Sequence, residues 1–220
     1  MQNFFEPLRQ CLLFNGIHPS DLEKLLRCLQ ARQRVCRKNE FIFSAGDAVR
    51  AIGIVLSGAV HIQQEDYWGN RTILAHITPG GLFGEAFSCA ETDSLPVSAA
   101  VAEDAEILLL DYKRIVTTCS SACAFHASLI QNMMKLLAQK NILLTQKMEI
   151  ITRRTTRERL LAYLSAQAAL AGKNRFTIPF NRQQLADYLS VERSAMSAEL
   201  SRMQADGLLW TNKSVFELRA

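Results

Sequence analysis

The sequence lacks any long uninterrupted hydrophobic run. None of its apolar segments approaches the roughly 18 residues that a membrane-spanning helix requires, and its first residues contain no basic segment of the kind that opens a signal peptide. We therefore expect a cytoplasmic protein with no membrane partner. With 49% hydrophobic and 21% charged residues, the composition is typical of a folded globular chain and not of a disordered one.

The sequence also lacks the short motifs that mark common classes of enzyme. It contains no phosphate-binding loop, no Gly-x-Ser-x-Gly elbow and no His-Glu-x-x-His zinc motif. Its four histidines are dispersed along the chain, and no two carboxylates have a spacing that supports acid–base catalysis. An enzyme is therefore the weakest hypothesis, and we predict neither catalytic residues nor a cofactor.

The six cysteines include no Cys-x-x-Cys pair. In a chain without an export signal, they are predicted to be thiols and not disulfides. Cys119, Cys123 and His126 would share one helix face, and all three side chains can ligate metals. No fourth ligand is apparent, so we favour a packing role and predict no metal site. A thiol-redox or metal-responsive switch that uses these residues remains the alternative.

Positive charge is concentrated in the last third of the chain. The net charge is +4 overall, and residues 151–220 contain eleven Lys and Arg against six Asp and Glu, which leaves 14 against 15 for residues 1–150. A basic C-terminal part is expected if that part, and not the rest, contacts a polyanion.

Residues 41–111 predict an antiparallel β domain. Short β-branched and apolar runs at 41–43, 52–56, 60–62, 72–74, 97–101 and 107–110 alternate with glycine-containing turns, among them Ser57-Gly58. Many short strands at such spacing are typical of a sandwich or barrel. Before them, apolar residues at helical spacing predict a helix from Ser20 to Leu29, with Ser20 as its N-cap and Glu23 completing a capping box.

Residues 121–151 contain no glycine or proline and predict one long helix. Its apolar residues follow the a/d spacing of a two-stranded coiled coil. The predicted dimerisation residues are Ile130, Met134, Leu137, Asn141, Leu144, Met148 and Ile151. Asn141 is a lone polar residue at an a position, which fixes register and partner number at some cost in stability. The alternative is a helix that packs only on its own domain.

Residues 181–203 predict two short helices joined by a tight turn. Asn181 can cap the first helix, with Gln184 reaching back to it, and Ser190-Val191 forms the turn. A helix with Ala195, Met196, Leu200 and Met203 facing inward follows, and Gly207 supplies the position that ends it. The strands predicted at 176–178, 208–210 and 215–218 flank this pair as a wing. The whole is typical of a winged helix-turn-helix that binds DNA.

The N-terminal end of the second helix is expected to read bases. We assign Arg193 as the principal reader, because arginine can hold guanine O6 and N7 in a bidentate pair. Arg182 and Lys213 are placed for phosphate contacts. The full predicted DNA-binding set is Arg182, Glu192, Arg193, Ser194, Ser197, Ala198, Arg202 and Lys213. An ordinary pair of packed helices would not explain the regional basic excess.

Having these elements in this order, the chain resembles the Crp/Fnr family, the cyclic-AMP-receptor-like regulators. Local matches include Gly46-Asp47, the segments 55–60, 79–85 and 102–106, and the helix-turn-helix itself. The resemblance covers roughly residues 10–218 and implies an α+β fold: an N-terminal antiparallel β-roll (a cupin-like jelly roll), a long dimerisation helix and a C-terminal winged helix-turn-helix. We accordingly predict a sensor domain at 1–120, the dimerisation helix at 121–151 and the DNA-binding domain at 152–220.

The resemblance implies a homodimer that binds a palindromic operator in double-stranded DNA, with RNA polymerase as a candidate partner and a signal sensed in the β-roll. Family members that bind cyclic AMP end their Gly-Glu cassette with an Arg-Ser pair. Here Gly84 and Glu85 are present, but no arginine occurs between Arg71 and Arg114. An anionic phosphate would then be desolvated without a counter-charge.

We therefore expect an effector other than cyclic AMP, with a small apolar or aromatic molecule as the working guess. The residues predicted to line its site are Phe83, Gly84, Glu85, Phe87, Ser98, Met133 and Met134. Cys11, Cys28 and Cys36 are too scattered to match the cluster-binding pattern of the Fnr branch. The recognition helix departs from the family pattern as well, because Ala198 stands where a second arginine is common.

Overall fold

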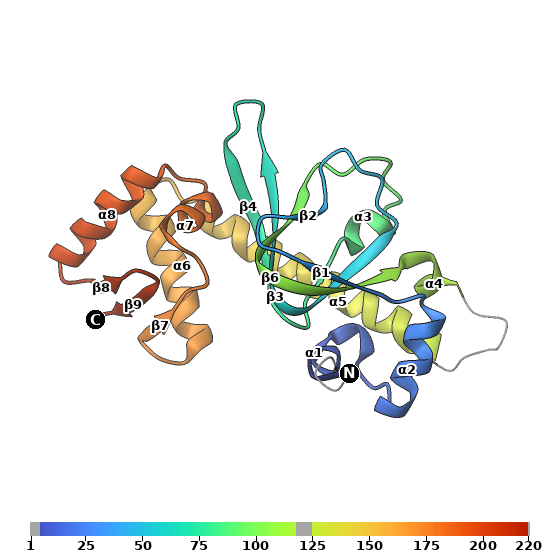
Figure 1. Cartoon of the computed structure of the whole chain (residues 1–220). Helices are drawn as coiled ribbons and strands as arrows, with labels where there is room; N and C mark the ends of the chain where they lie inside the picture. The colour runs from blue at the N-terminus through green and yellow to red at the C-terminus, as the bar shows by residue number, and fades with distance from the viewer. Residues whose placement is uncertain (1–4, 118–124, 220) are drawn as a thin grey trace. The chain divides into compact units, whose positions relative to one another are not determined.

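The computed structural model describes residues 5–117 and 125–219, which belong to two compact units, Met1–Lys140 and Asn141–Ala220. The boundary lies inside the long helix α5 (Phe125–Ile151). The sequence analysis instead treated residues 121–151 as a segment of their own. Figure 1 labels the elements of each unit, and each unit is described separately below.

The N-terminal unit is built on an antiparallel sheet, as the fold prediction requires. Its main strands run in the order β1-β6-β3-β4, with β2 added beside β6 and β5 beside β3. The strands are β1 (Arg32–Cys36), β2 (Phe41–Phe43), β3 (Ala51–Glu65), β4 (Arg71–Ile77), β5 (Leu82–Phe83) and β6 (Ser98–Asp111). The helices are α1 (Phe5–Gln10), η1 (Leu12–Phe14), α2 (Pro19–Cys28), α3 (Glu85–Cys89) and α4 (Tyr112–Val116). The predicted β-roll is confirmed.

Two details of the β domain differ from the prediction. Ser57-Gly58 is not a turn between two strands, because β3 continues through it and shifts register against β6 at this point. Gly58 has φ +74°, and a Cβ there would lie 2.1 Å from the carbonyl oxygen of Asp104, so the glycine permits a bulge. Strand β1 was not predicted, because four of its five residues are exposed and show no apolar alternation.

The start of α2 is also corrected. Its N-cap is His18, whose ring nitrogen accepts a hydrogen bond from the amide of Ser20, and Pro19 is the first helical residue. Proline is favoured at that position because its missing N–H would have no helical partner there. The predicted N-cap, Ser20, therefore lies inside the helix.

The C-terminal unit is a winged helix-turn-helix, as predicted. It contains α6 (Thr156–Ala171), β7 (Arg175–Thr177), α7 (Arg182–Leu189), α8 (Arg193–Ala205), β8 (Leu209–Asn212) and β9 (Val215–Leu218). The strands form a sheet in the order β7-β9-β8. Its core is made of apolar side chains from every element, including Leu164, Leu185, Met196, Leu200 and Phe216. Helix α6 ends at Gly172, which adopts the left-handed conformation.

Helix α5 has two apolar faces with different surroundings. Leu129, Met133 and Leu136 pack in the core of the N-terminal unit. The predicted a/d residues lie on another face, and none of the seven is buried in the single chain. Leu144 and Met148 are 56% and 60% exposed. Packing against its own domain therefore accounts for one stripe of the helix and leaves the heptad stripe uncovered. Within the described residues, no helix has both the length and the apolar character needed to cross a bilayer.

Candidate nucleic-acid interface and effector site

The angle between α7 and α8 is fixed by a short polar turn. Asn181 and Gln184 form the predicted capping box at the start of α7. Ser190 ends α7 with φ +52°, a left-handed conformation that favours glycine. Arg159 on α6 donates to the carbonyl oxygens of Leu189 at 3.2 Å and Ser190 at 2.8 Å. This contact, which the sequence analysis missed, holds the turn in place.

Glu192 caps the N-terminus of α8. Its carboxylate accepts hydrogen bonds from the Ser194 hydroxyl, from the Ala195 amide at 2.9 Å and from the Ser194 amide at 3.2 Å. The Ser194 hydroxyl and these amides hold the pKa of Glu192 below its usual value. Of the predicted DNA-binding residues, Glu192 and Ser194 are thus engaged in organising the helix end.

The exposed face of α8 begins with Arg193. This side chain is exposed at the first helical position, and no hydrogen bond or ion pair to another described residue engages its guanidinium. Ala198 is exposed and Ser197 is half-buried, while Met196 lies in the core. Ala195, predicted to face inward, is exposed.

Two further predicted basic residues lie near this face with different degrees of freedom. Arg202, in the last turn of α8, is 71% exposed and pairs with Glu199 at 3.1 Å. Lys213 is exposed in the β8–β9 turn, where its φ is +51°. Both are placed on the surface, as a contact with a polyanion requires.

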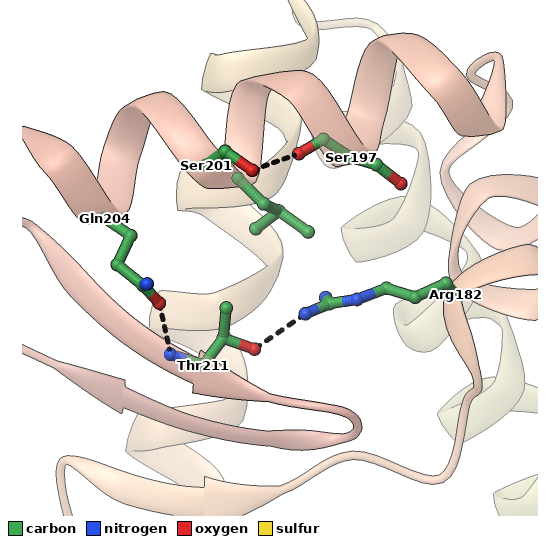
Figure 2. Close-up of a pocket in the computed structure, with 6 residues that line it drawn as sticks. Arg182, Ser197, Ser201, Gln204 and Thr211 are labelled. Atoms are coloured by element: carbon green, nitrogen blue, oxygen red, sulfur yellow. Dashed lines mark hydrogen bonds between the residues drawn. The ribbon is translucent and has the colours of Figure 1, made fainter.

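A pocket of about 270 Å³ separates α8 from the wing (Figure 2). Its lining consists of Arg182, Ser197, Leu200, Ser201, Gln204 and Thr211. Arg182, predicted as a phosphate contact, points into this pocket, where its Nη2 donates to the Thr211 hydroxyl at 2.8 Å. Its Nη1 is buried without a partner among the described residues. Burial lowers the pKa of Arg182 from its ordinary value.

The Gly-Glu cassette of the N-terminal unit contains a buried ion pair. Gly84, with φ +82°, caps α3, and the Glu85 side chain is 4% exposed. Lys140 of α5 donates to Glu85 Oε1 at 2.7 Å and to the Leu82 carbonyl at 2.6 Å. The other carboxylate oxygen, Oε2, is buried and has no partner among the described residues. Lys140 was missed, although it continues the inward row of Met133 and Leu136.

The other predicted effector residues are not gathered around one cavity. Phe83 is buried in the sheet core, with its ring 5.8 Å from that of Phe43, and Met133 is buried in the core around α5. Met134 is 67% exposed on the opposite side of that helix from the core. Phe87 is half-buried, and Ser98 Oγ accepts from the Ala45 amide at 2.9 Å.

The cysteine and histidine alternative receives little from the described residues. Cys119 and Cys123 lie outside them. His126 is buried and its Nε2 donates to the Arg114 carbonyl at 3.1 Å. Burial raises the pKa of Cys11 to about 11 and also raises the pKa of Cys36 and Cys89, which reduces the reactive thiolate fraction. Within residues 5–117 and 125–219, no group of three potential ligands is arranged to hold a metal.

Two family descriptions match the chain in succession. A cyclic nucleotide-binding domain matches residues 33–121, and a Crp-like helix-turn-helix domain matches residues 158–219. The first match covers the sheet and the Gly-Glu cassette, and the second covers α6 to the wing. Both agree with the fold derived from the residues.

Relatives and solved structures resemble the whole arrangement. The transcriptional activator protein FnrA of Stutzerimonas stutzeri is 25% identical over 183 residues, 81% of this chain and 72% of its own length. The cyclic AMP receptor protein of Thermus thermophilus is 33% identical over 107 residues, 47% of this chain and 48% of its own. The regulator CLP of Xanthomonas campestris, described as responsive to c-di-GMP, has a similar structure, with a TM-score of 0.75, 21% identity, and coverage of 92% of this chain and 100% of its own. That last likeness shows the fold alone.

Proposed function

We propose, from the premise that this chain belongs to the Crp/Fnr family of transcription regulators, that it acts as a homodimer on a palindromic operator and is gated by a small molecule other than cyclic AMP. The observation that carries the DNA-reading part is the state of α8. Its N-terminal end presents an exposed arginine with a free guanidinium on a helix whose other face is buried. A recognition helix reads base edges with this end.

The dimer is supported by the uncovered stripe of α5. Met134, Leu144 and Met148 are each more than half exposed, on a helix that already packs another face into its own domain. Contiguous exposed apolar residues on a monomer mark an interaction surface. A second copy of the same helix in the same heptad register is the partner that would cover all seven a/d positions, including Asn141 against its own counterpart.

The effector site is proposed at the Gly-Glu cassette, and the ion pair there supports an effector other than cyclic AMP. Glu85 already has a cation in Lys140, so a ligand hydroxyl would compete with an ammonium group for the same carboxylate oxygen. No arginine in the cassette is available for a cyclic phosphate. A ligand that engages Glu85 would therefore act on Lys140, and through it on α5.

Selection from a random duplex library tests the DNA-binding proposal. We expect enrichment of a palindrome whose half-sites lie one helical turn, about 34 Å, apart, because two copies of α8 must enter successive major grooves. Failure to enrich any motif at low salt would contradict sequence-specific binding. Adding cyclic AMP is expected to change neither the thermal stability of the protein nor its affinity for the selected site. A rise in both would overturn the proposed choice of effector class.

Substitution of Arg193 by alanine is expected to weaken binding to the selected operator by about 30-fold, corresponding to about 2 kcal/mol for one bidentate base contact. Discrimination at one base pair of each half-site should be lost at the same time. Binding titrations against operators mutated one position at a time would measure both effects. Arg27→Ala removes the same charge from the N-terminal unit and should leave the affinity unchanged. Equal weakening at every position would show that Arg193 contacts phosphate instead.

A further inference from the structure

Arg182 is the first residue of α7, and its side chain connects three elements of the DNA-binding unit. Its Nη2 donates to the hydroxyl of Thr211 on β8, and that hydroxyl donates to the Val215 carbonyl of β9 at 3.1 Å. The Thr211 amide in turn donates to Oε1 of Gln204 on α8 at 3.0 Å. As Figure 2 shows, Thr211 is the point where the contacts from Arg182 and from α8 meet.

The guanidinium of Arg182 is held from more than one side. Its Cζ lies 5.1 Å from the centre of the Phe216 ring, within the range of a cation–π contact. Nη1 is shielded from solvent and has no partner in the described part of the chain. A nitrogen with no solvent access cannot meet a phosphate oxygen unless the side chain leaves this position. Lys213, in contrast, is exposed at the tip of the wing.

We propose that Arg182 is a positioning residue that ties the wing to α7 and α8 through Thr211 and does not itself neutralise a DNA phosphate. The clamp fixes the separation of Lys213 on the wing from Arg193 on α8, so that both reach one duplex together. This inference rests on the proposed DNA-binding function and replaces the phosphate contact predicted for Arg182 from the sequence.

Salt dependence separates a clamp from a phosphate contact. Each neutralised phosphate contributes about 0.9 to the slope of log K against log salt concentration. Arg182→Met is expected to weaken operator binding about fivefold to tenfold with an unchanged slope. Lys213→Ala is expected to reduce the slope by about one. A slope reduced by about one in Arg182→Met would overturn the proposal.

Thr211 supplies a second variant that leaves the charge untouched. Thr211→Val should weaken binding by a factor similar to that of Arg182→Met, and the double variant should be no weaker than either single one, because both remove the same contact. Thr211→Ser keeps the hydroxyl and serves as the matched control, with affinity near that of the unmodified protein. Additive losses, or a Thr211→Val variant with full affinity, would contradict the clamp.

Amide hydrogen exchange provides a test without DNA. In the full-length free protein, Arg182→Met and Thr211→Val are expected to accelerate exchange in β8 and β9 and to leave α6 unchanged, because the wing loses its tie while the core remains. Unchanged exchange in β8 and β9 would overturn the clamp whether or not the protein binds DNA. Conversely, faster exchange in a protein that enriches no operator would retain the clamp and contradict only the proposed function.

Discussion

Replacing Leu144 and Met148 together by glutamate is expected to convert the protein into a monomer and to weaken operator binding by about 10²–10⁴-fold. Both side chains are more than half exposed on the uncovered stripe of α5. In a dimer they would face their own counterparts, so four carboxylates would be forced into an apolar seam. Sedimentation and DNA titration on the same samples would measure the two effects.

The size of this effect comes from linking two readers in one particle. When one α8 is seated in its half-site, the second binds as if at a high local concentration, and a monomer loses that gain entirely. Gln139→Glu with Gln146→Glu adds the same charge to exposed positions of α5 outside the stripe. This control should remain dimeric and bind normally. A dimeric Leu144→Glu, Met148→Glu protein with full affinity would rule out α5 as the dimer interface.

The fold could be predicted where local sequence and tertiary packing agree. The capping box at Asn181, the glycine that ends α6 and the apolar positions of α8 depend on residues within a few positions of one another, and the structure has all of them. The division of β3 failed at Gly58 because glycine permits both a turn and a bulge, and only the pairing with β6 decides between them. Strand β1 was missed because an exposed edge strand needs no apolar pattern.

The candidate sites were predictable to different depths for the same reason. Arg193 could be assigned because its exposure follows from helical periodicity within α8 alone. The position of Arg182 depends on Thr211, 29 residues further along the chain, and that of Lys140 depends on Glu85, 55 residues earlier. No local pattern contains such pairings. Phe83 and Met133 were assigned to a ligand site because large apolar residues line pockets and fill cores alike, and here they fill cores.

The second large effect is expected at the ion pair of the cassette. Lys140→Met should lower the free energy of unfolding of the N-terminal unit by about 3 kcal/mol, since removing one partner leaves the carboxylate of Glu85 buried without a counter-charge. We place the value at the lower end of the usual range because the Lys140 side chain is 29% exposed. Lys135→Met, an exposed position on the same helix, is the matched control and should change stability little. Equal effects of the two substitutions in urea unfolding would show that the pair does not stabilise the unit.

Adding Glu85→Gln to Lys140→Met distinguishes the charge from the contact. A neutral amide is cheaper to bury than a carboxylate, so the double variant should recover much of the lost stability. It should not recover the coupling of the cassette to α5, because the hydrogen bonds from the Lys140 ammonium to Glu85 and to the Leu82 carbonyl are gone. If the cassette acts on DNA binding through this lysine, the double variant will be stable and yet differ from the unmodified protein in operator affinity. A stable double variant with unchanged affinity would separate the ion pair from regulation and leave it a purely structural contact.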